Sequence, residues 1–183
     1  MSIATEFEYR CSVDSDIVGH LPYLFERASR AQTILELGVR SGNSTAAFLA
    51  GIEAGDGHLT SVDILAPQVP AEWFEHHRWT FILGSDLDEF VEAGTPDEVD
   101  LLFIDTTHTF RQTQAELDLY GGRVRSGGVI LLHDVDLEQA PLSDDPEDRG
   151  YPVRRAANEW CRRKFLNYDE RPGSYGLGVI EVV

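Results

Sequence analysis

Acidic and histidine side chains follow two short apolar runs of the sequence. Asp105 and His108 come after one run, and His133 and Asp134 come after a later one. If both runs are neighbouring parallel strands, their carboxyl ends share one crevice. Two carboxylates with water suit Mg²⁺ or Mn²⁺, whereas ligation by His133 would favour a transition metal. Alternatively, His133 and Asp134 only cap the following loop, and His108 only bonds a backbone group.

A second candidate site lies in a glycine-containing turn further towards the N-terminus. Gly38 and Gly42 allow a tight turn and a close approach to a ligand, and a helix starting at Ser44 would expose free N–H groups. Asp63, 25 residues after Gly38, is placed to accept hydrogen bonds from ribose hydroxyls, although it could instead cap a helix. The Gly38-x-x-x-Gly42 spacing lacks the pyrophosphate cradle of dinucleotide sites, so it favours a nucleoside without phosphates over NAD. Such a turn can also serve only to join a strand to a helix.

Strands and helices alternate along the chain, which predicts a mostly parallel sheet with helices on both faces. We expect strands at 33–37, 58–62, 79–83, 101–104, 129–132 and 177–183, and helices at 17–28, 44–53, 87–94, 109–124 and 153–160. The last strand is expected to be antiparallel. The predicted fold is thus a Rossmann-like α/β domain spanning residues 1–183, with an N-terminal helical segment at 1–32 and a mobile acidic loop at 136–152.

The length and charge of the chain limit the number of domains and the kinds of partner that we expect. The chain has 183 residues, which suits one domain, and 15 basic against 32 acidic residues give a formal net charge of −17. Such a field repels phosphate backbones and anionic membranes, so we expect no nucleic-acid or membrane partner. Residues 1–10 are charged and lack an apolar run, so we expect neither a signal peptide nor a membrane span there. Cys11 and Cys161 have no disulfide or metal spacing. These features predict a cytoplasmic protein.

Several of these segments together resemble a known family. Glu36-Leu37-Gly38 with Gly42, then Asp63, then Gly84-Ser85-Asp86 look like the successive cofactor motifs of class I S-adenosylmethionine (SAM)-dependent methyltransferases. The resemblance covers residues 33–132. It implies that Gly38 and Gly42 pack against the methionine portion and that Glu36 orients it. It also implies that Asp63 holds the ribose and that Ser85 and Asp86 lie beside the adenine.

A narrower resemblance covers residues 99–134. This stretch is similar to metal-dependent small-molecule O-methyltransferases, including macrolide-sugar and other glycoside methyltransferases, and to cephalosporin-hydroxylase-like relatives. It implies that Asp105 and Asp134 bind a divalent metal and that His108 is the general base. The chain departs from the pattern at His133, where those enzymes usually have an acid, so the metal's identity and the need for one stay open.

The chemistry agrees with these residue types. An aliphatic hydroxyl attacks a methyl sulfonium poorly unless a metal polarises it and a base takes its proton, and a histidine with an unperturbed pKa of about 6.5 can do so near neutral pH. We therefore expect a SAM-dependent, metal-assisted O-methyltransferase acting on a hydroxyl of a sugar or glycosylated small molecule, in a homodimer. Two alternatives are a metal-independent small-molecule methyltransferase and a catalytically silent SAM-binding or partner-binding protein.

Overall fold

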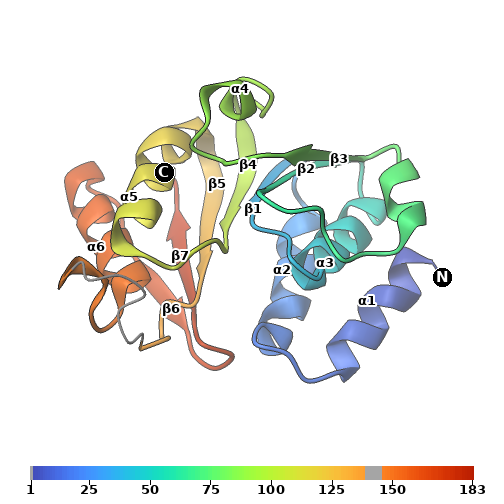
Figure 1. Ribbon diagram of the computed structural model, residues 1–183, viewed down its shortest axis with the longest axis horizontal. Helices are drawn as coiled ribbons and strands as arrows, with labels where there is room; N and C mark the ends of the chain where they lie inside the picture. Colours follow the sequence, from blue (N-terminus) through green and yellow to red (C-terminus); the bar gives the residue numbers. More distant parts are fainter. Residues whose placement is uncertain (1, 139–145) are drawn as a thin grey trace.

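A seven-stranded sheet organises the computed structural model, which describes residues 2–138 and 146–183 (Figure 1). The strands are β1 (Thr33–Leu37), β2 (His58–Asp63), β3 (Trp79–Leu83), β4 (Val99–Ile104), β5 (Val124–His133), β6 (Asp169–Arg171) and β7 (Leu177–Glu181). Their order is β3-β2-β1-β4-β5-β7-β6, in which β1 to β5 are parallel and β7 runs antiparallel to both β5 and β6. The predicted Rossmann-like class is confirmed, with β6 as an additional strand.

Helices cover both faces of the sheet. On one face lie α1 (Ile3–Ser12), α2 (Leu21–Ala28) and α3 (Asn43–Glu53), and on the other lie α5 (Phe110–Tyr120) and α6 (Pro152–Lys164) (Figure 1). Alternate residues of β4 separate the two cores, since Phe103 packs with the first group and Leu102 with the second. The remaining helical pieces are α4 (Glu89–Glu92) and the 3₁₀ turns η1 (Val18–His20), η2 (Ala71–Glu75), η3 (Gly121–Arg123) and η4 (Pro146–Asp148). Within the described ranges, none of the helices has both the length and the apolar character needed to cross a bilayer.

The strand order creates a switch point between β1 and β4. From β1 the chain winds outward to β2 and β3, and it then returns to β4 on the other side of β1. Gly38 follows β1 with φ +91°, and a Cβ there would collide with the backbone carbonyl of Asp105. Glycine therefore lets the ends of β1 and β4 pack closely, and the loops that leave them open a crevice above the sheet.

Two predicted helix boundaries are wrong at their ends. The Thr109 hydroxyl caps the backbone N–H of Gln112 at 3.3 Å, as the capping-box spacing predicted, but the helix stops at Tyr120. Val124, expected on that helix, instead begins β5. The short helix expected at 87–94 spans only Glu89–Glu92 (α4). Val91 packs against the core but Phe90 is 81% exposed, so only part of the predicted apolar face is buried.

The acidic segment predicted to be a loop at 136–152 is described only at its two ends, because residues 139–145 lie outside the described chain. Both ends are anchored. Asp136 donates its N–H to the Tyr175 carbonyl at 2.7 Å, and buried Asp148 accepts the N–H of Phe110 at 2.9 Å. The second bond caps the first turn of α5.

Candidate active site

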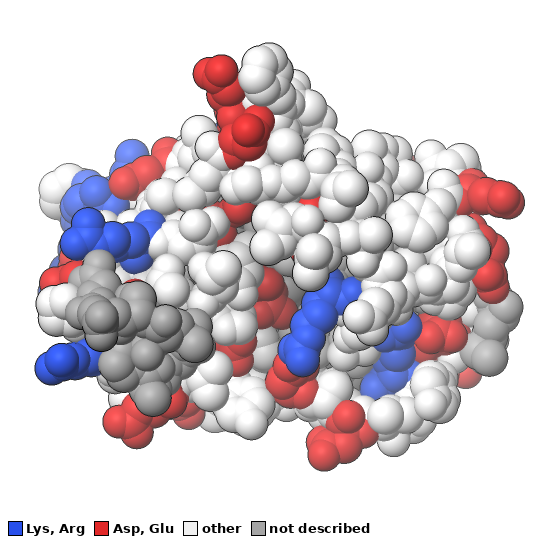
Figure 2. All heavy atoms as spheres, viewed as in Figure 1, with Lys and Arg blue, Asp and Glu red and all other residues white. Residues whose placement is uncertain are grey.

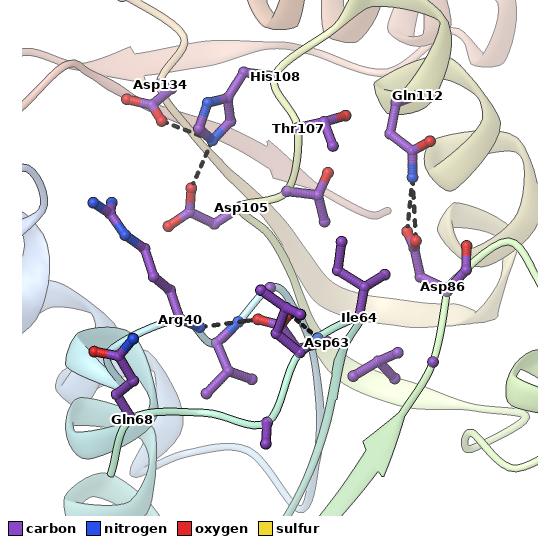
Figure 3. Close-up of a pocket in the computed structure, with 18 of the residues that line it drawn as sticks. Arg40, Asp63, Ile64, Gln68, Asp86, Asp105, Thr107, His108, Gln112 and Asp134 are labelled. Carbon is purple, nitrogen blue, oxygen red and sulfur yellow. Dashed lines mark hydrogen bonds and ion pairs between the residues drawn. The ribbon is translucent and has the colours of Figure 1, made fainter.

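A cavity of about 490 Å³ opens at the carboxyl ends of the parallel strands (Figure 3). Its walls come from the segments that follow β1, β2, β3, β4 and β5, together with α5. This volume falls within the range usual for small-molecule sites, and the position is the one where open α/β sheets bind ligands. Figure 2 shows acidic and basic side chains gathered at the central hollow of one face of the molecule.

Asp63, at the end of β2, fixes the glycine-containing turn. Its Oδ2 accepts the backbone N–H groups of Val39 at 2.8 Å and Arg40 at 2.9 Å, and its Oδ1 accepts that of Leu65 at 2.9 Å. The side chain also lines the cavity. Asp63 is therefore not a helix cap, and it offers a carboxylate to a ligand from a rigidly held position.

Glu36 lies beneath the cavity rather than in its wall. Its side chain is fully buried, and its carboxylate accepts hydrogen bonds from Ser44 (2.6 Å), Thr45 (2.9 and 3.0 Å) and Ser61 (2.6 Å). Ser61 in turn accepts the indole N–H of Trp79 at 2.9 Å. Burial raises the pKa of Glu36 to about 7, although the three hydroxyl donors oppose this shift.

Three residues expected to contact the cofactor are thus absent from the cavity wall. Glu36 and Ser44 belong to the buried network, and Gly42, with φ +75°, leaves room for the side chains of Val69 and Trp73. By contrast, four other residues that were expected to contact the cofactor do line the cavity, namely Gly38, Asp63, Ser85 and Asp86. Glu36 and Ser44 support the turn from below, because their hydrogen bond joins α3 to β1, and the bond of Ser61 to Glu36 adds β2.

At the β3 side of the cavity, Asp86 is held by a residue that sequence reasoning missed. The amide of Gln112 donates to both Asp86 oxygens, at 3.1 and 3.2 Å, and to Glu116 at 2.9 Å (Figure 3). Thr106 also donates to Glu116 at 2.5 Å. Burial, followed by the nearby Asp86, raises the pKa of Glu116 well above its ordinary value. The i, i+4 spacing of Gln112 and Glu116 on a buried helix face was the available signal.

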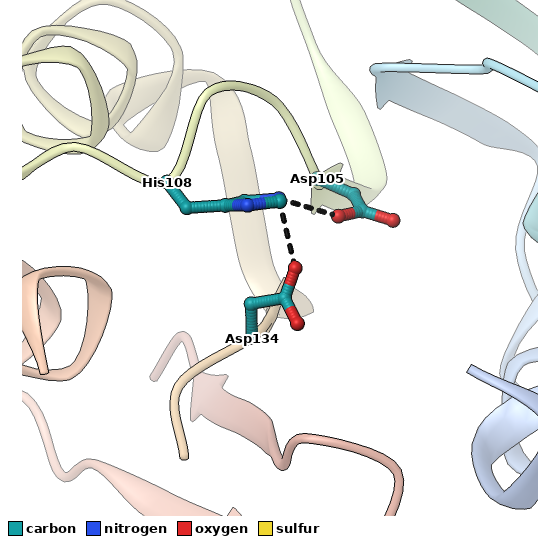
Figure 4. A group of neighbouring side chains, drawn as sticks. All are labelled: Asp105, His108 and Asp134. Atoms are coloured by element: carbon teal, nitrogen blue, oxygen red, sulfur yellow. Dashed lines mark hydrogen bonds and ion pairs between the residues drawn. The ribbon is translucent and has the colours of Figure 1, made fainter. Parts of the chain in front are cut away.

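Asp105, His108 and Asp134 converge at another part of the cavity (Figure 4). Nε2 of His108 lies 3.1 Å from Asp105 Oδ1 and 2.8 Å from Asp134 Oδ2. One potential ligand atom from each of the three lies within 4.8 Å of the others. His108 and Asp134 both have left-handed backbones, with φ of +55° and +59°, which turn their side chains towards Asp105.

His133 lies outside this group, contrary to the expected metal set. It is only 1% exposed and does not line the cavity. Its Nε2 lies 2.9 Å from the Ser174 carbonyl oxygen, and its Nδ1 lies 3.4 Å from Asp105 Oδ1. The ring is therefore held behind Asp105 by the segment that precedes β7, and His108 takes its place in the group of possible ligands.

The two aspartates and the two histidines of this region shift one another's pKa values. Burial alone would lower the pKa of either histidine, but hydrogen bonds to Asp105 and Asp134 outweigh it and raise the pKa of His108 to about 9 and that of His133 to about 11. Burial would raise the pKa of both aspartates, but the histidines hold them below their ordinary values. The ligand-free cluster therefore pairs two imidazolium ions with two carboxylates, and a cation would have to compete with these protons.

The fold and the cavity thus define an α/β protein with a small-molecule site at its switch point. The family profile of a methyltransferase domain matches residues 35–135, more than half of the chain, and the protein belongs to this family. The predicted relationship to class I methyltransferases is confirmed. None of the curated proteins compared with the sequence matches it.

Solved structures share the fold at low sequence identity. A methyltransferase from Podospora anserina, crystallised with S-adenosylhomocysteine (SAH), is 18% identical with a TM-score of 0.67 over 99% of this chain and 87% of that one. An O-methyltransferase from Bacillus cereus in complex with SAH is 16% identical, with a TM-score of 0.67 over 98% and 90%. The MycE methyltransferase of the mycinamycin biosynthetic pathway, in complex with Mg and SAH, is 16% identical, with a TM-score of 0.64 over 90% of this chain but only 49% of its own.

Proposed function

We propose that the protein transfers a methyl group from SAM to a hydroxyl of a sugar or glycosylated small molecule, with the help of Mg²⁺ or Mn²⁺. The observation that carries this proposal is the convergence of Asp105, His108 and Asp134 in the same cavity as Asp63 and Asp86. Structures similar in fold were crystallised with SAH, and one was crystallised with Mg, SAH and mycinamycin VI.

The adenosyl part of the cofactor fits the side of the cavity that holds Asp63 and Asp86. Asp63 would accept the ribose hydroxyls, and Ser85 and Asp86 would lie beside the adenine. Exposed Ile64 also lines this part and offers an apolar surface to a flat ring. Gly38 allows close approach of the ligand to the backbone. Bound here, SAM would supply an electrophilic methyl group on its sulfonium.

The donor set of the three-residue cluster fits a divalent cation. Asp105 and Asp134 offer hard oxygen ligands, which suit Mg²⁺ or Mn²⁺. A cation held there would lower the pKa of a hydroxyl bound beside it. We assign Asp105 and Asp134 as ligands and His108 as the base. Its pKa is raised by its contacts with the two carboxylates, so it would accept the hydroxyl proton only after a bound cation has taken these carboxylates and lowered that pKa. Buried His133 would keep Asp105 oriented through its contact at 3.4 Å.

The metal proposal can be tested by calorimetric titration of SAH and of Mn²⁺, together with methyl-transfer assays on a panel of glycosides. Asp134→Asn should abolish the Mn²⁺ response and leave SAH binding intact, whereas Asp136→Asn, at a half-exposed carboxylate outside the cavity wall, should change neither. EDTA should stop turnover, and Mg²⁺ or Mn²⁺ should restore it. Absence of SAH binding to the wild-type protein would refute the proposal.

Substitution of His108 distinguishes a role as general base from a role as metal ligand, and EDTA distinguishes the metal-assisted reaction from the metal-independent one. His108→Ala should remove turnover while keeping Mn²⁺ affinity if this residue is the base, and it should weaken Mn²⁺ binding if it is a ligand. A specific observation favours the metal-independent reaction as the second candidate, namely the contact of His108 with both aspartates. Under that alternative, EDTA leaves turnover unchanged.

We also propose a cytoplasmic location and a homodimer. Both cysteines are free in the structure, which agrees with a reducing compartment. A second copy of the chain would help to close the open side of the cavity over the acceptor. Sedimentation analysis would test the dimer, and a monomer that is fully active at assay concentrations would contradict it.

A further inference from the structure

An ion pair between Arg40 and Asp16 stands at the rim of the cavity. Nη1 of Arg40 lies 3.0 Å from Oδ2 of Asp16, and both residues line the cavity. Among the lining residues that the structure describes, Arg40 is the sole lysine or arginine, whereas five are aspartates. Its guanidinium is therefore suited to bind a negatively charged part of a ligand.

The backbone of Arg40 is fixed while its side chain is free to exchange partners. Its N–H donates to Asp63 at 2.9 Å, its carbonyl accepts the N–H of Gln68 at 2.9 Å, and its φ is +49°. The side chains of Arg40 and Asp16 are 84% and 39% exposed. An ion pair this exposed contributes little stability, so a ligand can replace it at small cost.

The direction of the Arg40 side chain indicates which part of a ligand it meets. Figure 3 shows it extending from the turn towards Asp105, away from Asp86. If the adenosyl group occupies the part near Asp63 and Asp86, the guanidinium lies beside the chain that leaves the 5′ end of the ribose. In SAM and SAH that chain ends in an amino acid, with one ammonium and one carboxylate.

We propose that Asp16 and Arg40 together bind the zwitterionic amino-acid end of SAM, an inference that rests on the proposed function. The planar guanidinium of Arg40 takes the ligand's carboxylate through paired hydrogen bonds, and the Asp16 carboxylate takes its ammonium. The zwitterion thus replaces one exposed ion pair by two without changing the net charge of the site. Asp16 and Arg40 therefore distinguish SAM from adenosine compounds that lack the amino acid.

Titration of two ligands tests this inference separately from the proposed function. SAH and 5′-deoxy-5′-methylthioadenosine share adenine, ribose and a thioether, but only SAH carries the amino acid. Both are titrated calorimetrically into wild type, Arg40→Gln and Asp16→Asn. Arg30→Gln serves as the control, because Arg30 is similarly exposed, also forms one ion pair, and does not line the cavity.

We expect Arg40→Gln and Asp16→Asn each to weaken SAH binding by about tenfold or more. Binding of the methylthio nucleoside should stay within about twofold of wild type, as should both ligands with Arg30→Gln. Equal weakening of both ligands, or unchanged SAH binding, overturns the inference and leaves the proposed function standing. The same holds if Arg40→Gln raises only the KM of the methyl acceptor. Failure of both ligands to bind wild type overturns the proposed function and the inference with it.

Discussion

Glu36 makes the stability of the protein depend on pH in a predictable direction. Its carboxyl is fully buried, and its pKa rises from 4.5 to about 7 on folding. The native state therefore binds the proton more tightly than the unfolded state does. Stability from this group is fully present below pH 4.5 and is lost as the pH rises towards 7 and above.

The size of the effect follows from the pKa difference. At about 1.4 kcal/mol for each tenfold change in proton affinity, ionisation of Glu36 costs the native state about 3 kcal/mol at high pH. About 2 kcal/mol of this cost develops between pH 5.5 and pH 8. For a domain of this size, that corresponds to a fall in Tm of about 4–8 °C.

Glu36→Gln removes the titration and keeps the shape of the side chain. Urea unfolding at pH 5.5 and 8 should show that wild type loses about 2 kcal/mol more than this variant across the interval. Other groups whose pKa is shifted by folding, such as Glu116 with its raised pKa, are common to both proteins and cancel in the comparison. Glu26→Gln, at an exposed carboxyl, should retain the wild-type pH dependence. If wild type and Glu36→Gln lose equal stability, Glu36 is ionised in the native state at pH 5.5 and the reasoning is wrong.

Gly38→Ala should lower the free energy of unfolding by about 2 kcal/mol or more, because the new Cβ meets the Asp105 carbonyl and φ is positive. Gly122→Ala, where a Cβ has open space, should stay within about 0.5 kcal/mol of wild type, and equal losses in urea unfolding would contradict the packing argument. Cys161 is 2% exposed, and burial raises the pKa of its thiol to about 11, so a thiol reagent at pH 8 should modify it only after unfolding. Mass spectrometry would detect rapid native-state labelling, which would exclude the buried environment described for this residue.

Strands that a local apolar pattern marks were predicted from the sequence. Strand ends that depend on pairing with a distant segment were not. The five parallel strands were recognised from apolar runs between turns. The start of β5 was missed because Gly127-Gly128 reads as a turn. In the structure, Gly127 donates its N–H to the Val182 carbonyl at 2.7 Å, so a distant strand supplies the partner. Helix α1 lies within the expected N-terminal helical segment at 1–32, but its own bounds were not predicted, because Ile3 is its one buried side chain and gives little apolar pattern.

The sequence predicted where the candidate site lies better than it predicted which side chains form it. Asp105 and Asp134 were expected to meet because both follow adjacent strands, and they do. The choice between His108 and His133 depends on left-handed backbone angles that no spacing rule provides. Arg40 was missed for a different reason, since its partner Asp16 comes from a loop on the other side of β1 in the sequence.

The candidate site is supported by the segment just before β7, which is synthesised after all of the site's own residues. Four consecutive residues, 173–176, have positive φ, and their carbonyl groups meet His133 at 2.9 Å and His20 at 2.8 Å. The second contact joins residues 153 positions apart. A nascent chain that has released only β1 to β5 from the ribosome thus carries all of the proposed catalytic side chains but lacks the support for His133. Ribosome-bound intermediates should accordingly acquire a competent site only after residues 173–181 emerge.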